Sequence, residues 1–136
     1  MVNTHADTRT VLIVDDEEMV LSLGRIILER KGYRVHIAQS GEQALVVCQD
    51  PTFQPDCVIV DYTMPMMNGR DTLLEIRKIH PSVPAIISSG YSDDEILEGM
   101  AGIAVSGIVH KPYRQDSLLA ALNTALATGP ADNARL

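Results

Sequence analysis

The sequence predicts a doubly wound α/β fold, in which helices cover both faces of a parallel five-stranded sheet. Five short apolar runs rich in β-branched residues alternate with segments that carry apolar residues at helical spacing. Most of the runs are apolar throughout, which is typical of strands buried on both faces. Strict alternation of strands and helices indicates βαβ units with right-handed crossovers. We therefore expect a (βα)5 domain of the flavodoxin-like type, with strand order 2-1-3-4-5.

The first half of the chain should form three of these strand–helix units. Strands are expected at 10–14, 34–38 and 57–61, and helices at 17–30, 41–49 and 70–80. The second of these strands is the most polar and should lie at the sheet edge. Gly32 is a plausible C-terminal cap for the first helix, and Ser40 with Gln43 forms a capping box that begins the second. Pro81 should end the third helix.

The second half of the chain should add two more units. Strands are expected at 84–90 and 105–110, and helices at 92–100 and 115–127. Ser92 and Glu95 form a second capping box, at the start of an acidic helix. Gly99 and Gly102 lie near the end of that helix, so it should be among the less stable elements. We expect residues 1–9 to be a mobile lead-in, 10–128 to be the domain and 129–136 to be a polar tail.

Apolar residues at helical spacing predict which face each helix buries. On the first helix these residues are Val20, Leu23, Ile27 and Leu28. The third helix carries the apolar residues Leu73, Leu74 and Ile76 toward His80. On the last helix they are Leu118, Leu119, Leu122 and Leu126.

Composition excludes several classes of function. The chain has 136 residues, enough for one domain with its own core, and a formal net charge of −7. That charge argues against direct binding to nucleic acid or to an anionic membrane, either of which would require a basic face. No apolar run is long enough to span a membrane, and the N-terminus lacks the apolar core of a signal peptide, so we expect a cytoplasmic protein. We also expect it to be a monomer or weak dimer. Cys48 and Cys57 have no metal-binding or redox spacing and should be small buried hydrophobes.

Polar residues follow the strands in a pattern that suits phosphoryl chemistry. Asp15 and Asp16 follow the first strand and Asp61 ends the third, two strands that are neighbours in the predicted order. Ser89 and Lys111 end the next two strands. Taken singly, each has a plain alternative: Asp61 could cap a turn, Ser89 could bond its own backbone, and Lys111 could be solvated. Glu17 and Glu18 are explained by the dipole of the helix that they begin.

The five residues have complementary chemical roles. Three packed carboxylates repel one another and need a cation, and Mg²⁺ suits a site made of carboxylates, water and a phosphoryl oxygen. A carboxylate is also a competent nucleophile toward phosphorus, giving an acyl phosphate at Asp61. Lys111 and the Ser89 hydroxyl could each stabilise one phosphoryl oxygen.

These motifs together resemble the response-regulator receiver domain of two-component signalling. The resemblance covers about residues 10–127 and rests on Asp15-Asp16, Asp61 with Met64-Pro65 and Gly69, Ser89-Gly90, and Lys111-Pro112. The amino-acid sequence around Ser89 and Lys111 is similar to that of the receivers at the C-terminal end of hybrid sensor histidine kinases. The expected function is that of a phosphoacceptor, not an enzyme in the ordinary sense.

The resemblance implies a role for each site residue. Asp61 would be phosphorylated by a histidine kinase or a histidine phosphotransfer protein. Asp16, Asp61 and the Thr63 carbonyl would bind Mg²⁺, with Asp15 assisting through water. Ser89 and Lys111 would contact the phosphoryl group, and the Lys111–Pro112 peptide bond would be cis.

One residue departs from the family pattern, and two other functions remain as alternatives. Receivers usually carry an aromatic residue three places before the lysine, where this chain has Ile108. An aspartyl-phosphate hydrolase of similar topology would need a nucleophilic Asp on the first strand, a second acid two places on, and a cap domain. This chain offers Glu17 at that second place and has no length to spare for a cap. A receiver-like adaptor that is never phosphorylated is the binding-only alternative.

Overall fold

Each strand and helix predicted from the sequence is present in the computed structural model, which describes residues 8–90 and 92–135, the last of them (128–135) by backbone only. The strands are β1 (Thr10–Val14), β2 (Arg34–Ala38), β3 (Cys57–Asp61), β4 (Ala85–Ser89) and β5 (Gly107–His110). The helices are α1 (Glu18–Glu29), α2 (Gly41–Gln49), α3 (Gly69–Ile79), α4 (Asp93–Gly99) and α5 (Gln115–Arg135).

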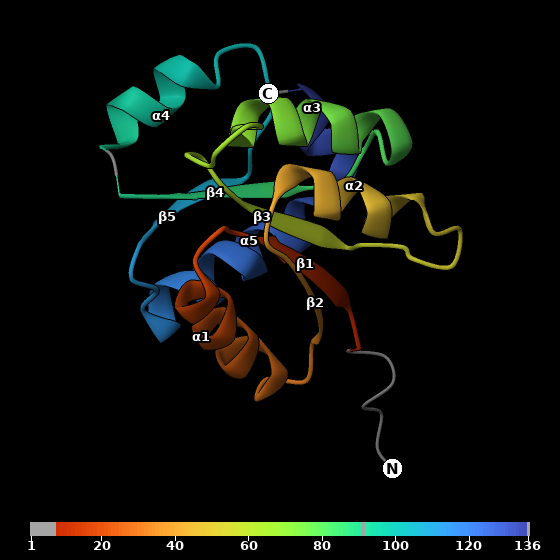
Figure 1. Ribbon diagram of the computed structural model, residues 1–136, viewed down its shortest axis with the longest axis vertical. Coiled ribbons are helices and arrows are strands. Elements are labelled where there is room, and N and C mark those ends of the chain that lie inside the picture. The colour runs from red at the N-terminus through yellow and green to blue at the C-terminus, as the bar shows by residue number, and fades with distance from the viewer. Residues whose placement is uncertain (1–7, 91, 136) are drawn as a thin grey trace.

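The strands form one parallel sheet in the order β2-β1-β3-β4-β5, which confirms the predicted flavodoxin-like topology. Figure 1 shows α2, α3 and α4 on one side of the sheet and α1 on the other. Alternate strand residues contribute to two apolar clusters, one shared with α2, α3 and α4 and one with α1 and α5. Every residue of β3 is buried, whereas β2 is an exposed edge strand as expected.

The face that α1 buries differs from the expected one. Its buried residues are Leu21, Gly24, Ile27 and Leu28. Leu23 is exposed, so the prediction was wrong for it, whereas Val20 is half-buried and packs against the apolar cluster shared by α1 and α5. A Cβ on Gly24 would lie 2.9 Å from Ile13 Cδ1 and 3.1 Å from a ring carbon of Tyr113. The helix therefore packs on the sheet through a glycine, which an apolar pattern does not count as core.

The last helix is longer than predicted. It was expected to end near Ala127, but its backbone continues to Arg135, through most of the segment expected as a polar tail. The extension contains Gly129 and Pro130, which have the lowest helix propensity, as well as Ala131 and Ala134, which have the highest, so propensity alone does not account for it. Leu118 and Leu122 are fully buried as expected. The expected lead-in falls largely on residues 1–7, outside the described residues.

Several local signals in the sequence are confirmed. Gly32 follows α1 with φ of +94°, a conformation that glycine adopts without strain. Ser40 and Ser92 accept hydrogen bonds from the backbone N–H groups of the residues three places on, at the starts of α2 and α4. Cys48 and Cys57 are buried, and burial raises their thiol pKa values to about 11 and about 12. None of the described helices is long and apolar enough to cross a membrane.

Candidate functional site

Three aspartates from two neighbouring strands meet at the carboxyl edge of the sheet. Asp15 directly follows β1, and Asp61 is the last residue of β3, which pairs with β1. One carboxylate oxygen from each of Asp15, Asp16 and Asp61 lies within 4.8 Å of the other two. Asp15 and Asp61 are buried whereas Asp16 is exposed, so the cluster opens to solvent on one side. This spacing of oxygen ligands fits a hard divalent cation.

Lys111, directly after β5, places its ammonium group among three carboxylates. Its Nζ lies 3.3 Å from Asp15 Oδ2, 3.2 Å from Asp61 Oδ2 and 3.1 Å from Glu17 Oε1. The contacts with Asp15 and Glu17 are hydrogen bonds in which Lys111 donates. The contact with Asp61 is close enough for an ion pair, yet Oδ2 of Asp61 accepts no well-aligned hydrogen bond within the described residues. The backbone N–H of Lys111 donates to the Ser89 carbonyl at 3.1 Å, which ties β5 to β4 at the site.

Burial dominates the electrostatics of these groups. Burial, with the charge of Asp15, raises the pKa of Asp61 to about 6, and the charge of Lys111 opposes this rise. Burial also raises the pKa of Asp15, against hydrogen bonds from the Glu17 N–H and from Lys111. For Lys111, burial lowers the pKa, but the Glu17 hydrogen bond and the charges of Asp15 and Asp61 outweigh it and raise the pKa overall. One lysine thus only partly offsets the buried negative charge, and a bound cation would complete the balance.

We expect the metal-free protein to lose stability as the pH rises through about 6. The folded-state pKa of Asp61, about 6, lies above its ordinary value of 3.8. The folded protein therefore binds this proton more tightly than the unfolded chain does. The contribution of the bound proton to the free energy of unfolding is complete below about pH 4 and is lost as the pH rises through about 6. Asp61→Asn removes the titration and should raise the free energy of unfolding near neutral pH by about 1–2 kcal/mol. Denaturant unfolding with a chelator, repeated across this pH range, measures the slope; an equal slope in Asp61→Asn would assign the titration to another group.

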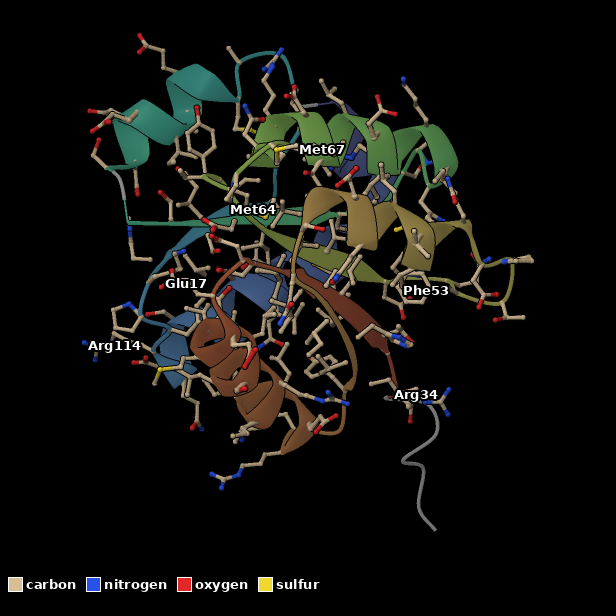
Figure 2. The ribbon with its side chains drawn as sticks, in the orientation of Figure 1. Glu17, Arg34, Phe53, Met64, Met67 and Arg114 are labelled. Carbon is tan, nitrogen blue, oxygen red and sulfur yellow. The ribbon has the colours of Figure 1, made fainter. Side chains whose placement is uncertain are left out.

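The connection from β3 to α3 folds back over Asp61. The Gly69 N–H donates to the Tyr62 carbonyl at 2.9 Å, and a Cβ on Gly69 would lie 2.5 Å from the Asp61 carbonyl oxygen. Only glycine fits this close approach. The Thr63 N–H donates to Asp61 Oδ1 at 3.3 Å, so the loop fixes the carboxylate. Figure 2 shows Met64 of this loop beside the carboxyl edge of the sheet.

The remaining predicted residues occupy the same edge of the sheet. Ser89 is the last residue of β4 and is buried, one place after Ser88, which pairs with Asp61 in the sheet register. Ile108, on β5, is half-buried and packs against the apolar cluster shared with α2, α3 and α4. The Lys111–Pro112 bond is cis, as the resemblance implied.

Comparison with known proteins shows the family to which the chain belongs. The family model for the response regulator receiver domain matches residues 11–123, most of the chain. The chain belongs to this family. The fold agrees: the receiver domain protein of Clostridium thermocellum has a TM-score of 0.76 and 32% identity over 88% of this chain and 94% of its own. The chemotaxis protein CheY4 of Vibrio cholerae has a TM-score of 0.77 and 29% identity over 88% of this chain and 99% of its own.

Curated relatives of this receiver domain are larger proteins. A sensor kinase, CckA of Brucella abortus, is 38% identical over 104 residues, which are 76% of this chain and 11% of that protein. A transcriptional regulatory protein, ZraR of Escherichia coli, is 36% identical over 125 residues, which are 91% of this chain and 27% of that protein. The chain therefore spans only about a tenth to a quarter of these relatives. Receiver domains of two-component systems act with histidine kinases or phosphotransfer proteins, and this is the general role of the domain.

Two features of the receiver site were not predicted from the sequence. Glu17 was assigned to the helix dipole, but its side chain binds Lys111. The signal available was its residue type, because glutamate is a poor N-cap. The hydroxyls of Ser88 and Tyr113 are both buried and lie near each other: burial raises the pKa of Tyr113 and Ser88 opposes this rise, although neither hydroxyl forms a well-aligned hydrogen bond within the described residues. The sequence does not predict which groups these hydroxyls contact, because Tyr113 lies beyond the end of β5 and the direction of its side chain depends on packing.

Proposed function

We propose that this receiver domain accepts a phosphoryl group on Asp61 in a Mg²⁺-dependent transfer from a phosphohistidine. The donor would be a histidine kinase or a histidine phosphotransfer protein. The observation that carries the proposal is the juxtaposition of Asp61 with two further aspartates and with the Lys111 ammonium at 3.2 Å. The raised pKa of Asp61 supports it, because a bound cation would stabilise the charged form of this buried nucleophile and so lower its pKa.

In the proposed transfer, a carboxylate oxygen of Asp61 attacks phosphorus as the bond from phosphorus to the donor histidine nitrogen breaks. The electron pair of that bond stays on the imidazole, which takes up a proton, and Asp61 becomes an acyl phosphate. Asp16, Asp61 and the Thr63 carbonyl would hold Mg²⁺, with Asp15 acting through water. When bound, the ion would neutralise charge on the carboxylates and on the phosphoryl oxygens.

Lys111 and Ser89 would contact the transferred group. The Lys111 ammonium, already at the site, supplies a positive charge to one phosphoryl oxygen, and the Ser89 hydroxyl donates to another. The same groups would also assist dephosphorylation, in which water attacks phosphorus and releases phosphate from Asp61. The domain would thus assist its own phosphorylation and dephosphorylation without being an enzyme for a separate substrate. Its readout is a change in a protein-binding surface, whose partner depends on the whole protein.

The first test is labelling by a small phosphodonor. With Mg²⁺ and acetyl phosphate, the protein should gain the mass of one phosphoryl group, and a chelator should abolish the gain because the anionic site then repels the donor. Borohydride reduction converts an acyl phosphate at aspartate into homoserine, so peptide mass spectrometry should find homoserine at position 61. Labelling that persists in chelator, or homoserine at position 15 or 16, would overturn the proposal.

A further inference from the structure

Glu17 occupies the N-cap position of α1 but does not cap the helix. Its side chain accepts no hydrogen bond from the first turn of α1. Glutamate is not a favoured N-cap residue, so capping does not explain its presence there. The side chain instead turns to Lys111, and its Oε1 lies 3.1 Å from Nζ. Figure 2 shows Glu17 where the chain enters α1, beside the carboxyl edge of the sheet.

Glu17 has no part in the cation cluster, which among the described residues consists of the three aspartates. A lysine ammonium has three N–H donors, and three carboxylate groups already lie within 3.3 Å of Lys111 Nζ. Among the acids described at the site, Glu17 is thus the one whose side chain has a described contact with Lys111 alone. Because Glu17 Oε1 and Asp61 Oδ2 contact the same nitrogen, a phosphoryl group on Asp61 would form beside the Glu17 carboxylate. The two anions would repel each other and compete for one ammonium.

Burial decides which carboxylate releases Lys111. Asp15 is fully buried, and its second oxygen accepts the Glu17 N–H at 2.9 Å, so its side chain is not free to rotate away from Lys111 into bulk solvent. The Glu17 side chain is 61% exposed, and water can replace its contact at little cost. Glu17 is therefore the partner that Lys111 would leave when a phosphoryl group arrives.

We propose that Glu17 is a positioning residue that competes with an incoming phosphoryl group for the Lys111 ammonium and so slows phosphorylation of the free domain. The role rests on the proposed phosphoacceptor function. It makes Glu17 a built-in restraint on small phosphodonors, which bring no protein contacts to displace it.

Three variants distinguish the effect of the contact between Glu17 and Lys111 from the effect of the negative charge of Glu17. Glu17→Gln removes the charge and weakens the contact with Lys111. Glu17→Asp keeps the charge, but its side chain is one methylene shorter and should not reach Lys111. Glu18→Gln is the matched control: it removes the same charge one residue further on, at a side chain whose described hydrogen bond is with Gln39. Circular dichroism and thermal unfolding establish that each variant is folded.

The rate constant of labelling by acetyl phosphate at saturating Mg²⁺ is the first measurement. Glu17→Gln should raise it about three- to fivefold, the size expected for one exposed ion pair. Glu17→Asp should raise it in the same direction, and Glu18→Gln should change it by less than about 1.5-fold. The beryllium fluoride concentration that half-saturates the protein, followed by NMR, should fall by a similar factor in Glu17→Gln. Loss of a merely structural contact would not speed the reaction or tighten this phosphoryl mimic.

The outcomes distinguish this role from the proposed function. If the wild type is labelled but Glu17→Gln is labelled no faster, Glu17 does not restrain Lys111. If Glu18→Gln speeds labelling as much as Glu17→Gln, general charge accounts for the effect and the positioning role is wrong. A wild-type protein that takes no phosphoryl group would overturn the proposed function, and the Glu17 role with it.

Discussion

Asp61→Asn should abolish phosphorylation by acetyl phosphate, with a loss in rate of at least about 100-fold. The amide is not a nucleophile toward phosphorus, and no other carboxylate at the site stands in its place. Asp15 is fully buried and both of its oxygens are engaged, by the Glu17 N–H and by Lys111. Asp16 is exposed and has no described contact with Lys111. The measurement is the fraction of protein carrying one phosphoryl group, by intact mass, as a function of time.

Two further variants make this result specific. Asp71→Asn removes an exposed aspartate from the first turn of α3 and should label at the wild-type rate. Asp16→Asn keeps the nucleophile but removes a proposed ligand, so it should need more Mg²⁺ and recover at high concentration. A labelled Asp61→Asn protein would show that the nucleophile had been misassigned.

Most of the fold could be predicted from the sequence because its signals are local and strong. β3 is apolar and ends on Asp61, and all five of its residues are buried, so length and composition were sufficient to place it. The capping serines, Ser40 and Ser92, mark helix starts through a side-chain hydrogen bond that depends only on residues nearby. The strand order followed from the βαβ alternation, which leaves few topologies. That order in turn brought Asp15 and Asp61 to the same edge of the sheet.

What the sequence could not predict depends on tertiary contacts. Gly24 is part of the buried face of α1 because Ile13 and Tyr113 occupy the space where a side chain would lie. Glu17 reaches Lys111 from a position 94 residues away in the chain, and its local environment gave it a sufficient explanation as a helix-start acid. In both cases a residue with a plausible local role has its main contact in another element of the fold.

Lys111→Ala should destabilise the metal-free protein by about 2–3 kcal/mol near neutral pH, far more than the loss of an ordinary surface lysine. The Lys111 side chain is only 17% exposed, and its partners Asp15 and Asp61 are 0% and 2% exposed. Its removal leaves two buried carboxylates without a cation, and protonation, which would relieve them, becomes unfavourable as the pH rises. Chemical unfolding in the presence of a chelator measures the loss.

The control for Lys111→Ala is Lys78→Ala. The Lys78 ammonium forms an ion pair with Glu75 at 2.8 Å, but the Lys78 side chain is 70% exposed. Its removal should lower the free energy of unfolding by less than about 1 kcal/mol. Mg²⁺ should restore part of the stability of Lys111→Ala, because an ion that binds only the folded state stabilises it. Adding Asp61→Asn to Lys111→Ala should also recover stability, because it removes one of the two unpaired buried charges. An equal loss in both lysine variants, or no recovery from Asp61→Asn, would mean that Lys111 does not neutralise the buried aspartates. A large loss that both Mg²⁺ and Asp61→Asn relieve would identify Lys111 as the counter-charge of this site in the absence of metal.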